Sequence, residues 1–202
     1  IESWGKYKVI GQTVDDAVGE AFDKVARILG LPYPGGPEIS KLAEKARTEN
    51  ITKVAKLPRP MINSNNLNFS FSGLKTAVLY YVRDNFSGSY ENMTEENKAD
   101  VAREFEDAVV DVIRAKTKEA LDENETKTLI VGGGVIANKK IKEIFNNFEN
   151  EYNGLVVKTP TRELATDNSL MIAVTAYINI SLYPEILANT KKITAKGNLS
   201  FE

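Results

Sequence analysis

The stretch TPTRELATDNSLMIA, residues 159–173, holds an acidic residue, Asp167, that could bind a cation at the start of an expected helix. Asp167 lies where a loop gives way to an apolar run, so its carboxylate can either cap a helix or bind a metal ion. The chain contains no histidine and no cysteine, which excludes imidazole and thiolate ligands, a Ser-His-Asp triad and disulfides from these residues. One aspartate supplies only part of a metal site, because such sites need several ligands.

A second stretch, LIVGGGVIAN (129–138), brings three glycines to the end of an expected buried strand. The backbone can approach a ligand closely there, and the next helix offers unpaired N–H groups to an anion or a sugar hydroxyl. The alternative is an ordinary strand-to-helix turn in which Asn138 caps the helix. Residues 132–137 also satisfy G-x-G-x-x-A, the dinucleotide fingerprint, with acidic residues near positions 149–151. This match to the dinucleotide fingerprint is weak, because such a fingerprint normally opens a run of βαβ units and only one further strand follows here.

A row of carboxylates marks the first expected helix. Asp16, Glu20 and Asp23 are spaced by four and three residues, so they share one helix face and can bind ribose hydroxyls or a cation. The alternative is a solvated surface on which Glu20 pairs with Lys24 and Asp23 pairs with Arg27.

The stretch FSFSGLKT gathers Ser70, Ser72 and Lys75 around a glycine. It lacks the P-loop spacing. We expect Phe69 and Phe71 to be core residues and the serines to cap a helix, while Lys75 can add positive charge to an anion site.

The elements that position these residues follow from periodicity. Alternation predicts a strand over 6–11, and helical spacing predicts a helix that Thr13 caps and Gly30 ends. A loop rich in proline and glycine covers 31–39, a short helix follows near 38–47, and residues 48–68 read as an exposed connection.

The second half of the chain has a different pattern. A helix with Leu74, Val78 and Val82 on its buried face precedes a long amphipathic helix from about residue 94 to 122. Strand, turn and helix then alternate: a strand over 127–134, a helix from residue 138, a strand over 154–160 and a helix over 168–181. This order is typical of an α/β layer with parallel strands.

Composition limits the function classes. The 202 residues, 42% hydrophobic, suffice for one large or two small globular domains. The 26 basic and 28 acidic side chains give a net charge of -2, so no global positive field marks a dedicated nucleic-acid binder. The longest apolar run, SLMIAVTAYINISLY, is too short to span a bilayer, and the first residues do not resemble a secretory signal, so we expect the cytoplasm.

Four motifs together resemble one family: GQTVDDAVGEAFDKVARILGLPYPGGPEI, FSFSGLKTAV, VGGGVIANKKI and P-x-R-x-L-A-T-D-N-x-x-M-I-A. Their order and spacing, from about residue 9 to 178, are similar to the TsaD family of tRNA threonylcarbamoyladenosine transferases, formerly labelled O-sialoglycoprotein endopeptidases. The resemblance implies an actin, hexokinase and Hsp70-like fold with ribonuclease-H-like lobes. It also implies transfer of a threonylcarbamoyl group from threonylcarbamoyl-adenylate to N6 of the adenosine 3′ of the anticodon in tRNAs that read ANN codons.

The resemblance also implies site residues. Asp23 and Gly36 would line the adenylate site, together with Gly133, Gly134 and Asn138. Asp167 would bind one divalent metal ion, iron or zinc. The catalytic residues stay unassigned, and the expected partners are tRNA and the proteins TsaB and TsaE.

The departures from the family pattern lead to further expectations. An H-x-x-x-H metal pair and an S-G-G-H-T-type loop are absent, so we expect a piece of a longer protein that lacks the N-terminal lobe and is inactive alone. Residues 1–184 would form the C-terminal lobe, with a helical insertion at about 31–125, and residues 185–202 a polar tail. Two alternatives stay open: a non-catalytic scaffold that binds the family's partner proteins, and an NAD-binding oxidoreductase.

Overall fold

The computed structural model describes residues 1–187. Its helices and strands, in chain order, are α1 (Val18–Ile28), α2 (Gly35–Thr48), α3 (Ser72–Asn85), α4 (Glu95–Glu123), β1 (Thr128–Ile130), α5 (Lys139–Glu151), β2 (Val156–Lys158) and α6 (Ser169–Leu182). Short 3₁₀ turns stand at η1 (Tyr90–Asn92), η2 (Gly134–Ala137) and η3 (Arg162–Leu164). Two compact units result: unit 2 covers Ile10–Thr159, and unit 1 joins Ile1–Val9 to the described residues from Pro160 onward.

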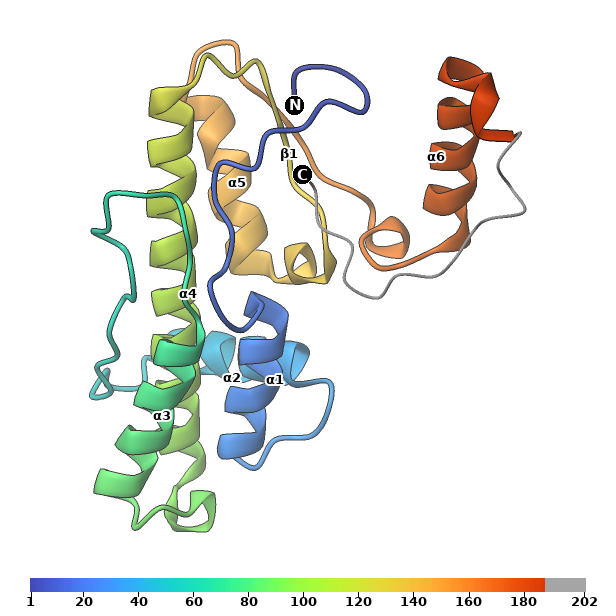
Figure 1. Cartoon of the computed structure of the whole chain (residues 1–202). Helices are drawn as coiled ribbons and strands as arrows, with labels where there is room; N and C mark the ends of the chain where they lie inside the picture. The colour runs from blue at the N-terminus through green and yellow to red at the C-terminus, as the bar shows by residue number, and fades with distance from the viewer. Residues whose placement is uncertain (188–202) are drawn as a thin grey trace. The chain divides into compact units, whose positions relative to one another are not determined.

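The long helix α4 is the centre of unit 2 (Figure 1). Helices α2 and α3 pack against it, α1 packs on α2 and α3, and α5 contacts it nearer its C-terminal end. Phe22 of α1 meets Phe105 of α4 edge to face at 5.0 Å between ring centroids, and both rings are buried. The buried apolar face predicted for the long helix is confirmed at Val101, Phe105 and Val109, so the core of unit 2 lies where α4 meets α1 and α2.

Local signals fix the start of α4. The Thr94 side chain accepts a hydrogen bond from the Asn97 backbone N–H, and the Asn97 side chain accepts one from the Thr94 N–H, which makes a reciprocal capping box. The helix predicted from about residue 94 to 122 therefore starts and ends within one residue of the prediction.

The cap of α3 differs from the prediction. The serines were expected to cap it, but the cap comes from Asp15, whose Oδ1 accepts hydrogen bonds from the N–H groups of Phe71 (2.8 Å) and Ser72 (3.1 Å). Ser70 Oγ donates to the other oxygen at 2.6 Å. Burial tends to raise the pKa of Asp15, but these three hydrogen bonds outweigh it and hold the pKa below its usual value.

Two predicted segments take another form. Residues 6–11 were expected to form a strand, but the described residues pair there only at an isolated bridge between Ser3 and Lys6, since no neighbouring strand runs beside them. The first helix begins at Val18 rather than after Thr13, because the Asp15 and Thr13 positions bend toward Phe69 and the start of α3.

The connection over 48–68 is not simply exposed. Ala55, Leu57 and Leu67 are buried in it. The Ala55 N–H donates to Asp100 at 2.7 Å and the Leu57 N–H donates to Glu104 at 3.1 Å, so carboxylates of α4 anchor this loop. A buried loop must satisfy its backbone groups in this way.

The predicted parallel α/β layer is confirmed as a two-stranded sheet among the described residues. β1 and β2 pair in parallel, with Leu129 opposite Val157 in the register, and η2 and α5 make the crossover between them. Phe145 and Phe148 of α5 are buried. The glycine turn therefore stands at the C-terminal end of β1, as the sequence predicts.

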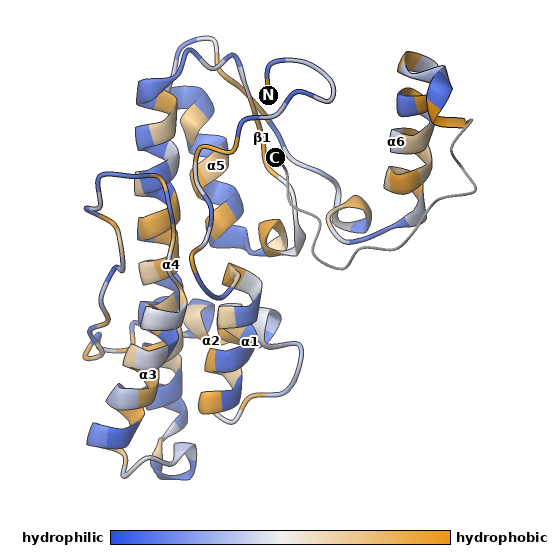
Figure 2. Cartoon of the chain, viewed as in Figure 1, coloured by the Kyte–Doolittle hydropathy of each residue, from blue (hydrophilic) through white to orange (hydrophobic). Residues whose placement is uncertain are grey.

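Unit 1 contains the loop after β2 and helix α6. Trp4 Nε1 donates a hydrogen bond to Asn179 Oδ1 at 2.9 Å, which ties the first residues to α6. Apolar residues occupy much of α6 (Figure 2), and Leu170, Ile172 and Tyr177 are exposed. No helix within residues 1–187 has the length and apolar character that a bilayer crossing requires. The polar tail predicted over 185–202 lies outside the described residues from 188 on.

Candidate functional site

Asp23 joins the first two helices of unit 2. Its Oδ1 accepts a hydrogen bond from the Gly35 N–H at 2.7 Å, so this half-buried carboxylate of α1 caps the N-terminus of α2. The ion pair with Arg27 that was the alternative does not form among the described residues. The second oxygen, Oδ2, makes no hydrogen bond within residues 1–187, which leaves it available to a donor such as a ribose hydroxyl.

The two glycines that open α2 have different surroundings. A Cβ at Gly35 would lie 2.5 Å from the Ala26 Cβ and 2.8 Å from the Asp23 Cα, so only glycine lets α2 approach α1 this closely. A Cβ at Gly36 would meet no atom within 4 Å. The N–H of Gly36 is one of the first four of the helix and has no intrahelical acceptor, so the start of α2 presents open backbone with a positive dipole end.

The glycine turn after β1 is similarly open. An added Cβ at Gly132 or Gly133 would meet nothing within 4 Å, and Gly133 has a φ of +91° that side-chain-bearing residues rarely adopt. Gly134 begins the 3₁₀ turn η2, which leads into α5. Glycines here keep the backbone accessible to a ligand.

Asn138 caps α5, as its alternative interpretation predicts. Its Oδ1 accepts a hydrogen bond from the Ile141 N–H at 2.9 Å. Its Nδ2 donates to Ser40 Oγ at 2.7 Å and to Glu106 Oε1 at 2.6 Å. The amide nitrogen and oxygen are thus both engaged within unit 2, and the prediction that Asn138 contacts a ligand directly stays a prediction.

Hydrogen bonds and close contacts bring these predicted residues into one neighbourhood. Ser40 lies one turn after Gly36 on α2 and binds Asn138. A Cβ at Gly19, one turn before Asp23 on α1, would lie 3.5 Å from the Val135 side chain in η2. The N-terminus of α2, the glycine turn and the start of α5 thus lie in one neighbourhood with Asp23. Such an arrangement suits a ligand that combines an anion with hydroxyl groups.

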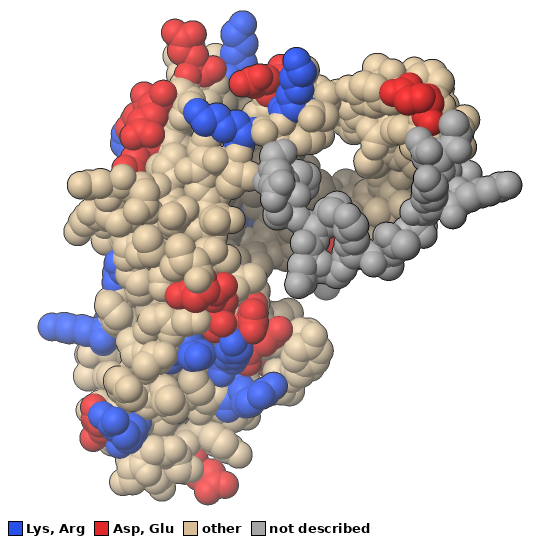
Figure 3. Space-filling model, in the orientation of Figure 1, with Lys and Arg blue, Asp and Glu red and all other residues tan. Residues whose placement is uncertain are grey.

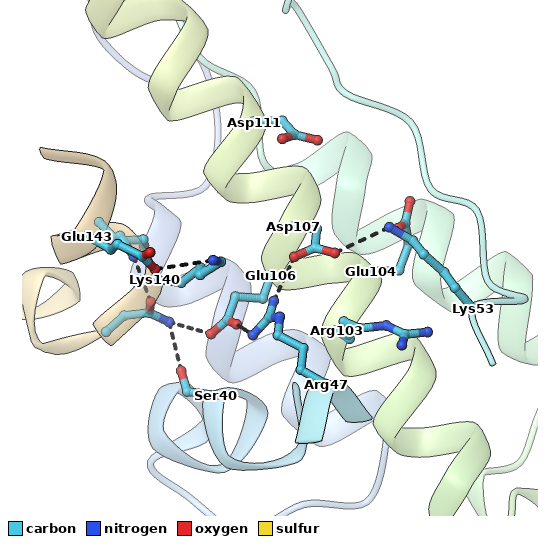
Figure 4. A network of polar contacts seen from close by, with 12 residues as sticks. Ser40, Arg47, Lys53, Arg103, Glu104, Glu106, Asp107, Asp111, Lys140 and Glu143 are labelled. Carbon is cyan, nitrogen blue, oxygen red and sulfur yellow. Dashed lines mark hydrogen bonds and ion pairs between the residues drawn. The ribbon is translucent and has the colours of Figure 1, made fainter. Parts of the chain in front are cut away.

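A buried polar network between α2 and α4 adjoins this neighbourhood (Figure 4). Arg47 of α2 binds Glu106 and Asp107 of α4, each at 2.6 Å. Burial tends to lower the pKa of Arg47, but the two carboxylates outweigh it and raise that pKa. The same contact with Arg47 overcomes burial at Asp107 and lowers its pKa. The sequence analysis named neither Glu106 nor Asp107, because no local signal distinguishes them from the other acidic residues of the long helix.

The rest of the carboxylate row clusters around Lys24. Lys24 lies 2.8 Å from both Asp16 Oδ1 and Glu20 Oε1, so the predicted Glu20–Lys24 pair is confirmed. The hydrogen bond from Lys24 lowers the pKa of Asp16, and the charge of Lys75 acts in the same direction. Lys75 therefore places positive charge near the start of α1.

On the face drawn in Figure 3, acidic and basic side chains stand beside one another over the helices of unit 2. This mixture agrees with the net charge of -2. A polyanion would therefore be held by local groups, not by a field of one sign.

Asp167 belongs to unit 1. It precedes α6, but the helix cap is Asn168, whose side chain accepts a hydrogen bond from the Met171 N–H at 2.9 Å. Asp167 is exposed and its carboxylate makes no hydrogen bond or ion pair within residues 1–187, so it is free to bind a cation. No group of three or more acidic residues that could hold a metal ion occurs in the described part of the chain. These residues therefore fit an implied metal only as the source of one ligand.

Comparison with known proteins agrees with this arrangement. The model of the family described as TsaD, tRNA N6-adenosine threonylcarbamoyltransferase, matches residues 1–174. Proteins of that name are 44% identical over 185 residues in Herminiimonas arsenicoxydans and 45% identical over 182 residues in Burkholderia ambifaria. A third, from Paraburkholderia xenovorans, is 43% identical over 192 residues.

These alignments cover 92%, 90% and 95% of this chain but 52%, 51% and 54% of the relatives. The chain thus spans about half the length of the curated relatives it matches. Because the family model covers most of the sequence, including the glycine turn, Asp23 and Asp167, the chain belongs to the TsaD family.

Proposed function

We propose that this chain supplies the adenylate-binding part of an enzyme that transfers a threonylcarbamoyl group from threonylcarbamoyl-adenylate to N6 of an adenosine in tRNA. The adenosine is the one 3′ of the anticodon in tRNAs that read ANN codons. The observation that carries the proposal is the convergence of Asp23, Gly36 and the turn at Gly133 and Gly134 in a chain of this family.

Each group has a role in holding the adenylate. The free Oδ2 of Asp23 accepts hydrogen bonds from ribose hydroxyls. The unpaired N–H groups at Gly36 and at the glycine turn receive the phosphate, which suits the positive ends of α2 and α5. Asn138 keeps the turn in place beside them.

The transfer then balances as an acyl transfer. The N6 nitrogen of the adenosine attacks the carbamoyl carbon, the bond from that carbon to the phosphate oxygen breaks, and AMP leaves with the electron pair while N6 loses a proton. Negative charge grows on the leaving phosphate oxygens, so N–H groups fixed beside them stabilise the transition state more than the ground state.

We propose Asp167 as one ligand of the family's divalent metal ion, iron or zinc, with the other ligands outside the described residues. A bound cation would polarise carbamoyl or phosphate oxygens. Membership of the TsaD family also supports three further proposals. The fold is an actin, hexokinase and Hsp70-like lobe, and the compartment is the cytoplasm. The partners are tRNA and the proteins TsaB and TsaE.

Two other functions predict different results. A scaffold that only binds partner proteins would bind no adenylate. A nicotinamide oxidoreductase would bind NADH saturably without competition from AMP. The family match favours the transferase over the oxidoreductase.

The test is calorimetric titration with AMP of the protein at the length that its gene encodes. Asp23→Asn keeps an oxygen for the Gly35 N–H but replaces the free carboxylate oxygen with an amide. It should therefore weaken AMP binding about tenfold or more, as loss of a hydrogen bond to a charged group does, while the melting temperature stays unchanged. Glu20→Gln, one turn away and paired with Lys24, is the matched control. Unchanged AMP affinity in Asp23→Asn would contradict the assigned role.

A further inference from the structure

The amide of Asn138 can take only one orientation. Its Nδ2 faces the carboxylate of Glu106 at 2.6 Å, and its Oδ1 faces the Ile141 N–H at 2.9 Å. A carboxylate only accepts and a backbone N–H only donates. Exchanging the amide oxygen and nitrogen would therefore set oxygen against oxygen and donor against donor, so the contacts with Glu106 and Ile141 decide the orientation.

Glu106 is suited to this task because it is itself fixed. Its side chain is 2% exposed, and its Oε2 receives Arg47 at 2.6 Å while its Oε1 receives Asn138. Arg47 is held further by Asp107. A buried carboxylate with both oxygens engaged has little freedom to turn.

The contact joins segments that are distant in sequence. Glu106 lies in the middle of α4, and Arg47 and Ser40 lie on α2 (Figure 4). Asn138 ends the glycine turn and starts α5. Asn138 is therefore the point at which the glycine turn is tied to the helical core of unit 2.

We propose that Glu106 is a positioning residue: through Asn138 it fixes the glycine turn and the N-terminus of α5 in the geometry that receives the adenylate. This role rests on the proposed function, since it concerns the same ligand. Glu106 does not touch the ligand, and its effect passes through the amide of Asn138.

The chemistry of the pair provides an exchange test. In Glu106→Gln, the new amide must turn a donor toward either Asn138 or Arg47, both of which are donors. In Asn138→Asp, two carboxylates meet where an amide and a carboxylate stood 2.6 Å apart. Asn138→Asp therefore breaks the contact itself, and Glu106→Gln loses either this contact or the contact with Arg47 that holds residue 106 in place.

The double variant, Glu106→Gln with Asn138→Asp, restores the contact. The introduced amide oxygen accepts from Arg47, and the introduced amide nitrogen donates to the new carboxylate at position 138. That carboxylate still caps α5 from its other oxygen, because aspartate is a good N-cap residue, and the hydroxyl of Ser40 can rotate to donate to it.

The experiment is AMP titration of wild type, both single variants and the double variant, at the length that the gene encodes. Each single variant should bind AMP about tenfold more weakly and the double variant should recover most of that loss, as expected for residues coupled in one hydrogen-bond network. Glu104→Gln is the control: it is an equally buried carboxylate on α4, 3% exposed, that binds Arg59 and Lys53 and not Asn138. It should lower the melting temperature without changing AMP affinity.

The outcomes separate the two claims. Wild-type protein that binds no AMP overturns the proposed function, and the positioning role with it. Wild-type binding that persists unchanged in both single variants overturns the positioning role alone. Weakened binding in the single variants without recovery in the double variant also contradicts it, because the loss would then not pass through the Glu106–Asn138 contact.

Discussion

Glu104 should be a principal anchor of the loop over residues 51–59. Its side chain is 3% exposed, accepts a hydrogen bond from the Leu57 N–H at 3.1 Å and lies 2.6 Å from Lys53. Arg59 also binds it. The change Glu104→Ala removes the carboxylate and leaves these groups without that partner.

The magnitude follows from what each group retains. The Leu57 N–H is buried and loses its acceptor, which costs about 1–3 kcal/mol. Arg59 keeps Asp111 at 2.9 Å and Lys53 keeps Asp107 at 3.2 Å, so the two cations do not incur the full cost of about 3–5 kcal/mol for a broken buried pair. We expect the free energy of unfolding to fall by about 2–4 kcal/mol at neutral pH.

The effect should depend on pH with a definite sign. Burial tends to raise the pKa of Glu104, but the contacts with Arg59, Lys53 and the Leu57 N–H outweigh it and lower the pKa. The pKa of a glutamate in an unfolded chain is about 4.3. A carboxyl whose pKa is lower in the folded state stabilises the fold fully above this unfolded pKa, and it loses this contribution as the pH falls through the folded pKa. The gap in stability between wild type and Glu104→Ala should therefore narrow below about pH 4.3.

The assay combines urea unfolding with hydrogen exchange of the peptide that covers residues 51–59. Faster exchange in that peptide is expected in Glu104→Ala. The matched control is Asp111→Ala, which removes the exposed partner of Arg59 and should cost less than about 1 kcal/mol. Exchange at wild-type rates in Glu104→Ala, or a stability gap that widens on acidification, would refute the anchoring role.

Three further predictions concern the cap of α3, the glycines that open α2, and Asp167. Asp15→Ala removes the acceptor for the first N–H groups of α3, so unfolding free energy should fall by about 1 kcal/mol; urea unfolding measures it, and an unchanged midpoint would count against the cap. Gly35→Ala places a Cβ 2.5 Å from the Ala26 Cβ, whereas a Cβ at Gly36 meets no atom within 4 Å. Thermal unfolding should therefore show Gly35→Ala destabilised by about 1–3 kcal/mol and Gly36→Ala unchanged. Equal melting temperatures for the two variants would contradict this close approach of α2 to α1. Asp167→Asn should lose bound iron or zinc in elemental analysis while circular dichroism is unchanged, and retention of the metal would remove Asp167 from the ligand set.

The sequence predicted those features whose signals are local. Thr94 and Asn97 are three residues apart, and their capping box marks the start of α4. Asn138 caps α5 by the same short-range rule. The parallel pairing of β1 and β2 follows from strand, helix and strand in succession.

Features that depend on distant partners were missed. Asp15 caps α3 through hydrogen bonds to Phe71 and Ser72, which lie 56 and 57 positions further along the chain. Asp100 binds the N–H of Ala55, which lies 45 positions before it. Glu106 looks like any solvated acid of an amphipathic helix until Arg47 and Asn138 are placed beside it. At Asp167 the predicted alternatives were a cap or a metal ligand, and the cap is Asn168, one residue later.

The central claim is tested most directly by transfer of the labelled threonylcarbamoyl group. The protein at the length that its gene encodes, supplied with threonylcarbamoyl-adenylate carrying labelled threonine, TsaB, TsaE and an ANN-decoding tRNA, should place the label on N6 of the adenosine 3′ of the anticodon. Asp23→Asn should lower that rate. Label that fails to appear on tRNA, with the protein folded and binding AMP, would contradict the transferase function.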